Sequence, residues 1–226
     1  MINVLELFSG TKSVGKVCDS LGWSSVSVDL ILPADHEVDI MDFDYKQYPK
    51  DYFDIIWASP PCTFYSHLQN CWIGRKKKDG TILTKEKIEE KMNESDKLIL
   101  KTLEIIHYFD CEYWFMENPQ TGKLKSREVV KGLNFYDVDY CMYSDWGYKK
   151  RTRIWTNKKD WNNKLCDGSG SCGNMILINN GTRKHIKVCD GGYDKRRKPN
   201  LDVGKGTNKL DRYRVPEELI YSLFFD

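Results

Sequence analysis

Cys62 is the side chain of this sequence best placed for covalent chemistry. It follows a short apolar run, residues 53–57, and two consecutive prolines, Pro60 and Pro61, which fix the backbone as it leaves a predicted strand. The carboxyl ends of strands are where α/β proteins bind ligands, and a thiolate at that position is a nucleophile. A small buried core cysteine is the alternative. The polar groups within residues 63–66 favour the nucleophile.

Glu117 and Asn118 form a second candidate pair. They follow the apolar run 113–116, which predicts another buried strand. We therefore expect the carboxyl group of Glu117 to enter the same crevice as Cys62, where it could donate a hydrogen bond or a proton to a substrate. An acid that ends a strand and caps the next turn is the competing interpretation.

Arg151 and Arg153 are the candidate cationic pair. They alternate with Thr152 and Ile154, so that both guanidinium groups face one side of a strand. Two arginines beside an acidic site can orient a carboxylate or bind phosphate. An ordinary basic edge strand has the same pattern, and the residues alone leave both interpretations open.

Alternating strands and helices must position these side chains. The first strand runs into a glycine turn and a helix, which is how a nucleotide-binding α/β unit begins, and Asp29 near the end of the next strand is typical of an acceptor for ribose hydroxyls. The pattern predicts strands over residues 3–8, 25–30, 53–59, 113–117, 136–143 and 152–156, and helices over 14–21, 84–109 and from Pro216 onward.

The length of the chain and the extent of its strand–helix alternation predict one main domain with smaller additional segments. The chain has 226 residues, and the strand–helix alternation stops near residue 157. We expect a catalytic domain over 1–157, a small irregular insert over 158–208 and a C-terminal helix over 209–226 that packs on the catalytic domain.

Composition places the chain in a broad class. Its eight cysteines are scattered, which favours a reduced, intracellular protein over a disulfide framework. The chain has no run long and apolar enough for a membrane span and no signal-peptide pattern at its start, so we expect a soluble protein of the cytoplasm or nucleus of a host cell. The formal net charge is only +2, yet residues 75–78 and 195–198 are each four consecutive basic residues. Each run is either a solvated loop or a contact with nucleic-acid phosphates. The oligomeric state is not set by any of these features.

The order of five motifs makes the interpretation specific. LELFSGTKSVG, SVDL, SPPCTFYS, FMENP and KKRTRIW, spread over residues 3–157, together resemble the motif series of the C5-type DNA cytosine methyltransferases, especially the short forms carried by viruses and phages. The resemblance implies a Rossmann-like methyltransferase sheet with helices on both faces, S-adenosyl-L-methionine as cofactor and double-stranded DNA as partner.

The resemblance also implies roles for the residues already singled out. Cys62 would attack C6 of a cytosine flipped out of the duplex, and Glu117 would hydrogen-bond N3 and the exocyclic amine. Arg151 and Arg153 match the arginine pair of the family, which orients the glutamate and contacts the cytosine. The cofactor site would consist of Phe8, Ser9, Gly10, Thr11, Ser13, Asp29, Leu30, Asp39, Ile40 and Pro61, and the substrate site of Ser66, Asn118 and the basic loop residues Arg75, Lys76, Lys77 and Lys78.

The chain departs from the family pattern in several places. Lys149 stands where the family often has Gln, and Leu30 replaces a common Trp. We find no clear counterpart of the large target-recognition domain of the family or of its C-terminal Gly-Asn-Ser motif. Recognition of the DNA sequence must therefore be minimal or be carried out by the insert. A tRNA cytosine C5 methyltransferase with the same nucleophile, and a non-catalytic nucleic-acid-binding homologue, are the alternative functions.

The insert contains a possible zinc set. Cys166, Cys172, His185 and Cys189 are separated by gaps of five, twelve and three residues. Three thiols and an imidazole can build a tetrahedral zinc site, which would order a glycine-rich segment that lacks a core. The gap of five is atypical for such sites, so the sequence favours unligated loop cysteines over zinc.

Overall fold

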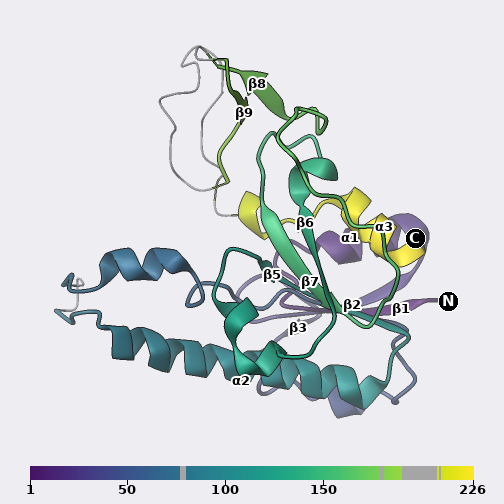
Figure 1. Cartoon of the computed structure of the whole chain (residues 1–226). Coiled ribbons are helices and arrows are strands. Elements are labelled where there is room, and N and C mark those ends of the chain that lie inside the picture. The colour runs from purple at the N-terminus through teal and green to yellow at the C-terminus, as the bar shows by residue number, and fades with distance from the viewer. Residues whose placement is uncertain (77–79, 179–180, 190–207, 209) are drawn as a thin grey trace.

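The computed structural model describes residues 1–76, 80–178, 181–189, 208 and 210–226. Its centre is a seven-stranded sheet in the order β3-β2-β1-β4-β5-β7-β6 (Figure 1). The first five of these strands are parallel, and β7 and β6 complete the sheet in antiparallel pairing. The strands are β1 (Asn3–Leu7), β2 (Ser24–Asp29), β3 (His36–Glu37), β4 (Ile55–Ala58), β5 (Tyr113–Pro119), β6 (Phe135–Asp139) and β7 (Arg151–Thr156).

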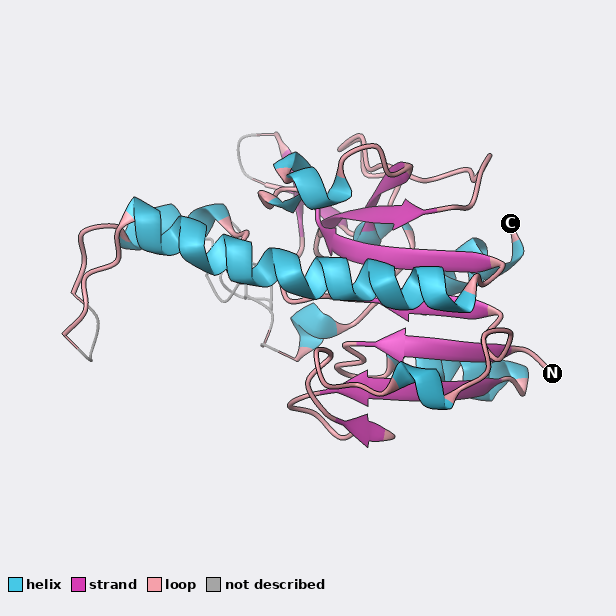
Figure 2. Cartoon of the chain, turned by 90° about the horizontal axis from the view of Figure 1, so that it is seen from below, coloured by secondary structure: helices cyan, strands magenta, loops and turns pink. Residues whose placement is uncertain are grey.

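Helices cover both faces of this sheet, as the sequence predicted. The long α2 (Lys85–Phe109) lies along one face (Figure 2), while α1 (Ser13–Leu21) and α3 (Glu217–Phe225) pack together on the opposite face. Short 3-10 helices join the main elements at η1 (Tyr45–Gln47), η2 (His67–Trp72), η3 (Leu124–Ser126), η4 (Glu128–Val130), η5 (Tyr140–Met142) and η6 (Asp211–Tyr213). None of the described helices has both the length and the apolar character needed to cross a bilayer.

The two helical layers explain why the central strands are apolar throughout. All four residues of β4 are buried, because β4 lies between β1 and β5 and both of its faces are covered. Leu5, Leu7 and Ile56 pack toward α2, and Val4 and Trp57 pack toward α1 and α3. This two-sided burial fixes where β4 and β5 end, and therefore where Cys62 and Glu117 are placed.

The structure corrects three of the expected boundaries. Strand β5 continues through Asn118 and Pro119, because both residues pair with β7. Strand β6 ends at Asp139, where the chain turns into η5. The segment expected to be irregular contains a two-stranded antiparallel sheet, β8 (Met175–Leu177) and β9 (Arg183–His185). Lys77, Lys78 and the basic run 195–198 lie outside the described residues.

Glu6 is a buried acid in the middle of the sheet. Its Oε1 accepts a hydrogen bond from the Val14 amide at 3.1 Å, and its Oε2 accepts one from the Gly15 amide at 2.9 Å. The carboxylate therefore caps the first turn of α1 and ties that helix to β1. Burial raises the pKa of Glu6 to about 7, although the two amides oppose this shift.

The pKa of Glu6 gives a prediction for stability. Because the folded state holds the Glu6 proton up to about pH 7 and the unfolded chain loses it near 4.5, the free energy of unfolding should fall as pH rises through that window. The loss should reach about 3 kcal/mol. Glu6→Gln has no titrating group at this position, so its free energy of unfolding should lack this dependence on pH. In urea unfolding, the amount by which wild type is more stable than Glu6→Gln should therefore decrease as pH rises from 4.5 to 7. The exposed Asp19→Asn is the control, and parallel pH profiles for wild type and Glu6→Gln would contradict the assignment.

Candidate active site

The ends of β4 and β5 bring the predicted nucleophile and the predicted acid to one edge of the sheet. The two strands pair in parallel register, Ala58 opposite Met116, so their exits lie side by side. The Nδ2 of Asn118 donates a hydrogen bond to the Pro60 carbonyl at 2.8 Å, and both residues are buried. This bond ties the loop that carries Cys62 to the strand end that carries Glu117.

The loop after Cys62 is held by Tyr65, whose side chain is completely buried. The Tyr65 amide donates to the Cys62 carbonyl at 3.1 Å, and the Tyr65 hydroxyl donates to Asp96 of α2 at 2.8 Å. The Lys123 amide donates to the Tyr65 carbonyl at 2.8 Å, which joins this loop to the segment after β5. The two loops enclose a cavity of about 260 Å³ lined by Cys62, Ser66, His67, Leu68, Pro119, Thr121 and Gly122.

Cys62 is exposed, yet its thiol has an unusual electrostatic environment. Desolvation by the surrounding protein and the carboxylate of Glu117 raise its pKa, while the positive charges of Lys150 and Arg212 lower it. The Nζ of Lys150 also donates to the Arg212 carbonyl at 3.0 Å, which ties the Lys150 side chain to the backbone of the C-terminal segment. The pKa of the thiol is therefore raised overall, with burial as the largest cause and the charges of one acid and two basic residues as smaller opposing ones.

Glu117 is buried, and the structure gives it a hydrogen-bond donor among the residues it describes. The hydroxyl of Tyr140, itself completely buried, donates to Glu117 Oε2 at 3.4 Å. Lys150 lies over the Tyr140 ring at 4.6 Å. In the β5–β7 register Glu117 is opposite Ile154, so both side chains leave the same face of the sheet.

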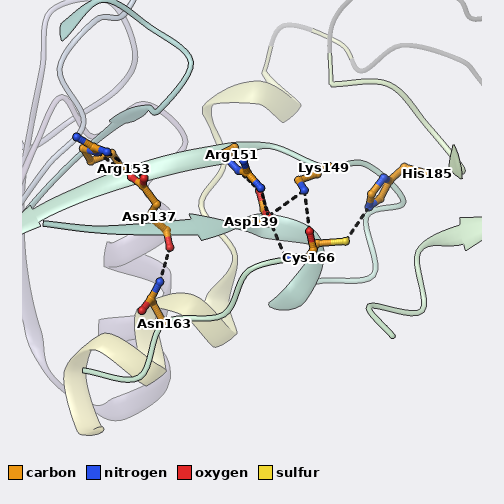
Figure 3. Close-up of polar contacts among 8 residues, drawn as sticks. All are labelled: Asp137, Asp139, Lys149, Arg151, Arg153, Asn163, Cys166 and His185. Atoms are coloured by element: carbon orange, nitrogen blue, oxygen red, sulfur yellow. Dashed lines mark hydrogen bonds and ion pairs between the residues drawn. The ribbon is translucent and has the colours of Figure 1, made fainter. Parts of the chain in front are cut away.

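Arg151 and Arg153 share one face of β7, as the alternation predicted, but it is not the face of Glu117. The register places Arg153 one residue out of phase with the partner of Glu117, and side chains alternate along a strand. Each arginine instead binds an aspartate of β6 (Figure 3). Arg151 contacts both oxygens of Asp139 at 3.1 Å, and Arg153 contacts those of Asp137 at 2.7 and 2.9 Å. The structure therefore does not bring the arginine pair to the expected carboxylate.

The turn after β1 and the end of β2 form a second polar region at this edge. Asp29 Oδ2 accepts from the Gly10 amide at 2.9 Å, and its Oδ1 accepts from the amides of Ile31 and Leu32 at 2.8 Å. The buried hydroxyl of Ser9 has no hydrogen-bond partner among the described residues. A buried hydroxyl without a partner costs free energy, so this turn has a polar group available to a ligand.

The other residues predicted to bind the cofactor differ in how exposed they are. Leu30 is exposed at the end of β2, whereas Ile40 is buried, and Asp39 accepts a hydrogen bond from the Met41 amide at 2.9 Å. Pro61 is exposed beside Cys62. An exposed leucine next to an acid presents an apolar surface that an aromatic base could cover.

The residues at the start of α1 are tied to the C-terminal part of the chain. Phe8 has a positive φ of 55°, which turns the backbone sharply after β1. Thr11 and Ser13 join their hydroxyls at 3.3 Å, and the Ser13 hydroxyl accepts from the Val215 amide at 3.1 Å. The segment around Val215 therefore lies against the same turn.

The two described basic loop residues lie away from the sheet. Arg75 stacks on exposed Trp72, 5.1 Å from the ring centroid, and Lys76 forms an isolated bridge with Ile82. Figure 1 shows this segment projecting beyond the sheet together with the start of α2. Ser66 caps η2 by accepting from the Leu68 amide at 3.2 Å.

Three residues near Cys62 and Glu117 were missed by the sequence reasoning. The sequence pattern predicts a strand at Tyr140 and a helical tail that contains Arg212. Lys150 directly precedes the arginine pair and carries no motif of its own. Strand alternation gives a signal for Lys150, since it must face opposite to Arg151, but nothing local to Arg212 indicates that it reaches Cys62.

The possible zinc set of the sequence changes by one member in the structure. Cys166, Cys172 and His185 come together, but Cys141 of η5 joins them instead of Cys189. The reason is topological, because β6 ends early and delivers Cys141 to the insert.

Comparison with known proteins identifies the family. A probable DNA (cytosine-5)-methyltransferase of Frog virus 3 (isolate Goorha) is 40% identical to the chain over 225 residues, which cover 98% of each protein. The chain belongs to the DNA (cytosine-5)-methyltransferase family. No protein-family model matches it.

The solved structures to which the chain is similar are more distant matches. They are Entamoeba histolytica methyltransferase EhMeth (TM-score 0.48, 16% identity, 74% of this chain and 56% of that chain), a mutant of Spodoptera frugiperda DNMT2 (0.43, 17%, 74% and 54%) and S. pombe Dnmt2 methyltransferase (0.43, 13%, 71% and 52%). The methyltransferase described here spans about half the length of these solved chains.

The charges around Cys62 predict how its reactivity depends on pH. Because Lys150 and Arg212 lower the pKa of the thiol, Lys150→Met and Arg212→Met should each raise it. At a fixed pH below the pKa the thiolate fraction falls about tenfold per unit of increase, so alkylation of Cys62 by iodoacetamide should slow. Peptide mapping separates Cys62 from exposed Cys71. The control is exposed Lys125→Met, and an equal rate in all four proteins would contradict the placement of these cations.

Proposed function

We propose that this protein transfers a methyl group to C5 of cytosine in DNA, with Cys62 as the nucleophile. The supporting observation is the pairing of a thiol and a buried carboxyl group at neighbouring strand ends, with the thiol lining a cavity, in a chain of this family. The cavity of about 260 Å³ suits a single base and part of its sugar. A base can enter such a cavity only after it has left the helical stack.

Cys62 performs the covalent step. The thiolate forms a bond between Sγ and C6 of the ring, and the electron pair of the C5–C6 double bond moves toward C5, which becomes nucleophilic. After C5 has been methylated, a base takes the C5 proton, the double bond re-forms and the Sγ–C6 bond breaks. Lys150 and Arg212 favour the thiolate that begins this sequence and receives the charge at its end.

Glu117 holds the ring during the addition. Its carboxyl group is proposed to hydrogen-bond N3 and the exocyclic amine, so that charge on the pyrimidine is stabilised where it develops. Tyr140 restrains the carboxyl group by donating to Oε2, and Asn118 restrains the strand end by its bond to Pro60. Arg151 and Arg153 are bound to aspartates of β6, and so they support the sheet edge rather than the substrate.

S-adenosylmethionine would supply the electrophilic methyl group. The family uses this cofactor, and the chain has suitable groups on the turn after β1 and at the end of β2. Asp29 is placed to accept hydrogen bonds from ribose hydroxyls, and the unpartnered Ser9 hydroxyl and the Gly10 turn can contact the amino-acid part. Leu30, Asp39 and Ile40 are proposed to contact the adenine.

The duplex is proposed to contact the basic loop and the insert. Arg75 and Lys76 are exposed before the start of α2, and strand β9 of the insert carries Arg183 and Lys184, with Lys187 two residues beyond it. Positive side chains of this kind bind phosphate without reading sequence. We therefore assign residues 158–208 to target recognition in a reduced form.

Trapping with 5-fluorocytosine tests the mechanism. Fluorine at C5 cannot leave as a proton does, so in the presence of S-adenosylmethionine a covalent protein–DNA adduct should accumulate and survive denaturation. Cys62→Ala should abolish it, whereas Cys71→Ala, which removes another exposed cysteine, should not. The readout is a shifted band on a denaturing gel.

Two outcomes would separate the alternatives. Labelled methyl transfer to tRNA in preference to duplex DNA, in direct competition, would support the RNA methyltransferase. The absence of any adduct across varied DNA sequences and tRNA would favour a non-catalytic homologue.

Cofactor binding gives an independent prediction. Asp29→Asn keeps an oxygen that can accept from the Gly10 amide but loses the charge, so affinity for S-adenosylmethionine should fall about 10- to 100-fold. Isothermal titration calorimetry measures this without any nucleic acid. The exposed Asp19→Asn on α1 is the matched control, and unchanged affinity in Asp29→Asn would place the ribose elsewhere.

A further inference from the structure

Four metal-binding side chains meet where the insert joins the catalytic sheet. They are Cys141, Cys166, Cys172 and His185, and their ligand atoms all lie within 4.8 Å of one another. The Nε2 of His185 is 3.7 Å from the Sγ of Cys166 and 3.7 Å from the Sγ of Cys172. Three thiols and one imidazole have therefore converged from three segments of the chain: η5, the loop between β7 and β8, and β9.

The two separations from His185 match the edges of a zinc tetrahedron. With Zn–S of about 2.3 Å and Zn–N of about 2.0 to 2.1 Å, tetrahedral angles place sulfur and nitrogen about 3.6 Å apart. The three cysteines are not joined by disulfides, and Cys141 and Cys166 are buried. Soft thiolates with one imidazole select zinc over calcium or magnesium, which prefer oxygen ligands.

A buried amide organises the backbone that carries the ligands. Asn174 is 3% exposed, and its Nδ2 donates to the carbonyls of Cys141 and Cys172, each at 2.9 Å. Its Oδ1 accepts from the Gly147 amide at 2.8 Å. Hydrogen bonds of this kind hold the loops that carry metal-binding residues and orient the side chains that contact the metal.

The surrounding charges suit a thiolate-rich site. Three thiolates and a dication leave one net negative charge, and the buried carboxylate of Asp139 adds a second. Lys149 and Arg151 bind Asp139, and the Lys149 Nζ also donates to the Cys166 carbonyl at 2.9 Å (Figure 3). The two cations balance the two negative charges, so the cluster with zinc is neutral as a whole.

We propose that Cys141, Cys166, Cys172 and His185 bind one structural zinc ion. Four protein ligands close the tetrahedron and leave no position for a substrate, so the role is structural. The described part of the insert buries few apolar side chains, among them Trp161 and Ile178, and the ion would supply order that this small core cannot. Because Cys141 directly follows β6, the ion would fasten the insert to the catalytic sheet.

Metal analysis of the full-length protein, purified under reducing conditions without added chelator, tests the site. About one zinc per chain is expected from inductively coupled plasma mass spectrometry. Cys172→Ala should lose the metal, and Cys172→His, which restores a zinc ligand, should retain it. Cys189→Ala is the matched control, because Cys189 lies in the same segment but outside the cluster, and it should bind as wild type does.

A second measurement keeps the test independent of folding defects in the variants. Wild-type protein stripped with a chelator should take up Co²⁺ and develop the strong visible absorption of tetrahedral thiolate coordination, with release of about three protons per ion. Reduced wild-type protein that contains no zinc and takes up no Co²⁺ would overturn the proposal. So would equal metal loss in Cys189→Ala and Cys172→Ala.

Discussion

The hydrogen bond from Asn118 to the Pro60 carbonyl is the constraint on which the site depends. Parallel pairing brings the ends of β4 and β5 to one edge, but it does not set the distance between the loops that leave them. The Asn118 amide joins the two exits inside the protein, where water does not compete with a hydrogen bond. Cys62 lies two residues after Pro60, and Glu117 directly precedes Asn118. This one hydrogen bond therefore positions both side chains.

Much of this arrangement follows from the sequence, because strand ends are local features. Apolar runs that stop at Pro60 and near Asn118 place Cys62 and Glu117 at the sheet edge, and the family resemblance supplies the chemistry. The faces of β7 are a different matter. Which side Arg151 occupies depends on the pairing register with β5, a long-range property that alternation within one strand does not contain.

The same limit applies to residues brought in from distant parts of the chain. Arg212 reaches Cys62 and Cys141 reaches the insert only because of how the chain crosses the sheet edge, so their neighbours in sequence give no indication. The zinc set was therefore expected to be contiguous within the insert, whereas the structure draws one ligand from the end of β6. Regular elements were predictable, and contacts between segments far apart in sequence were not.

Asp139 shows how closely the two regions are connected. It is completely buried, and its hydrogen bonds from Arg151, the Cys166 amide and Lys149 hold its pKa below the usual range in spite of burial. One carboxylate thus joins β6, β7 and the insert. A displacement of the insert would therefore be transmitted through Asp139 to β7, the strand that pairs with β5.

The position of Arg212 late in the chain has a consequence for synthesis. Cys62 and Glu117 emerge from the ribosome well before residue 212, so the growing chain contains the thiol and the nearby carboxylate without one of the two cations that lower the pKa of that thiol. The growing chain also lacks the burial that raises the pKa of this thiol in the folded protein, so Cys62 ionises more readily before folding than in the finished site. The order of residues along the polypeptide therefore presents the thiol to solvent first, and its shielded surroundings are complete only when the C-terminal segment has folded against it.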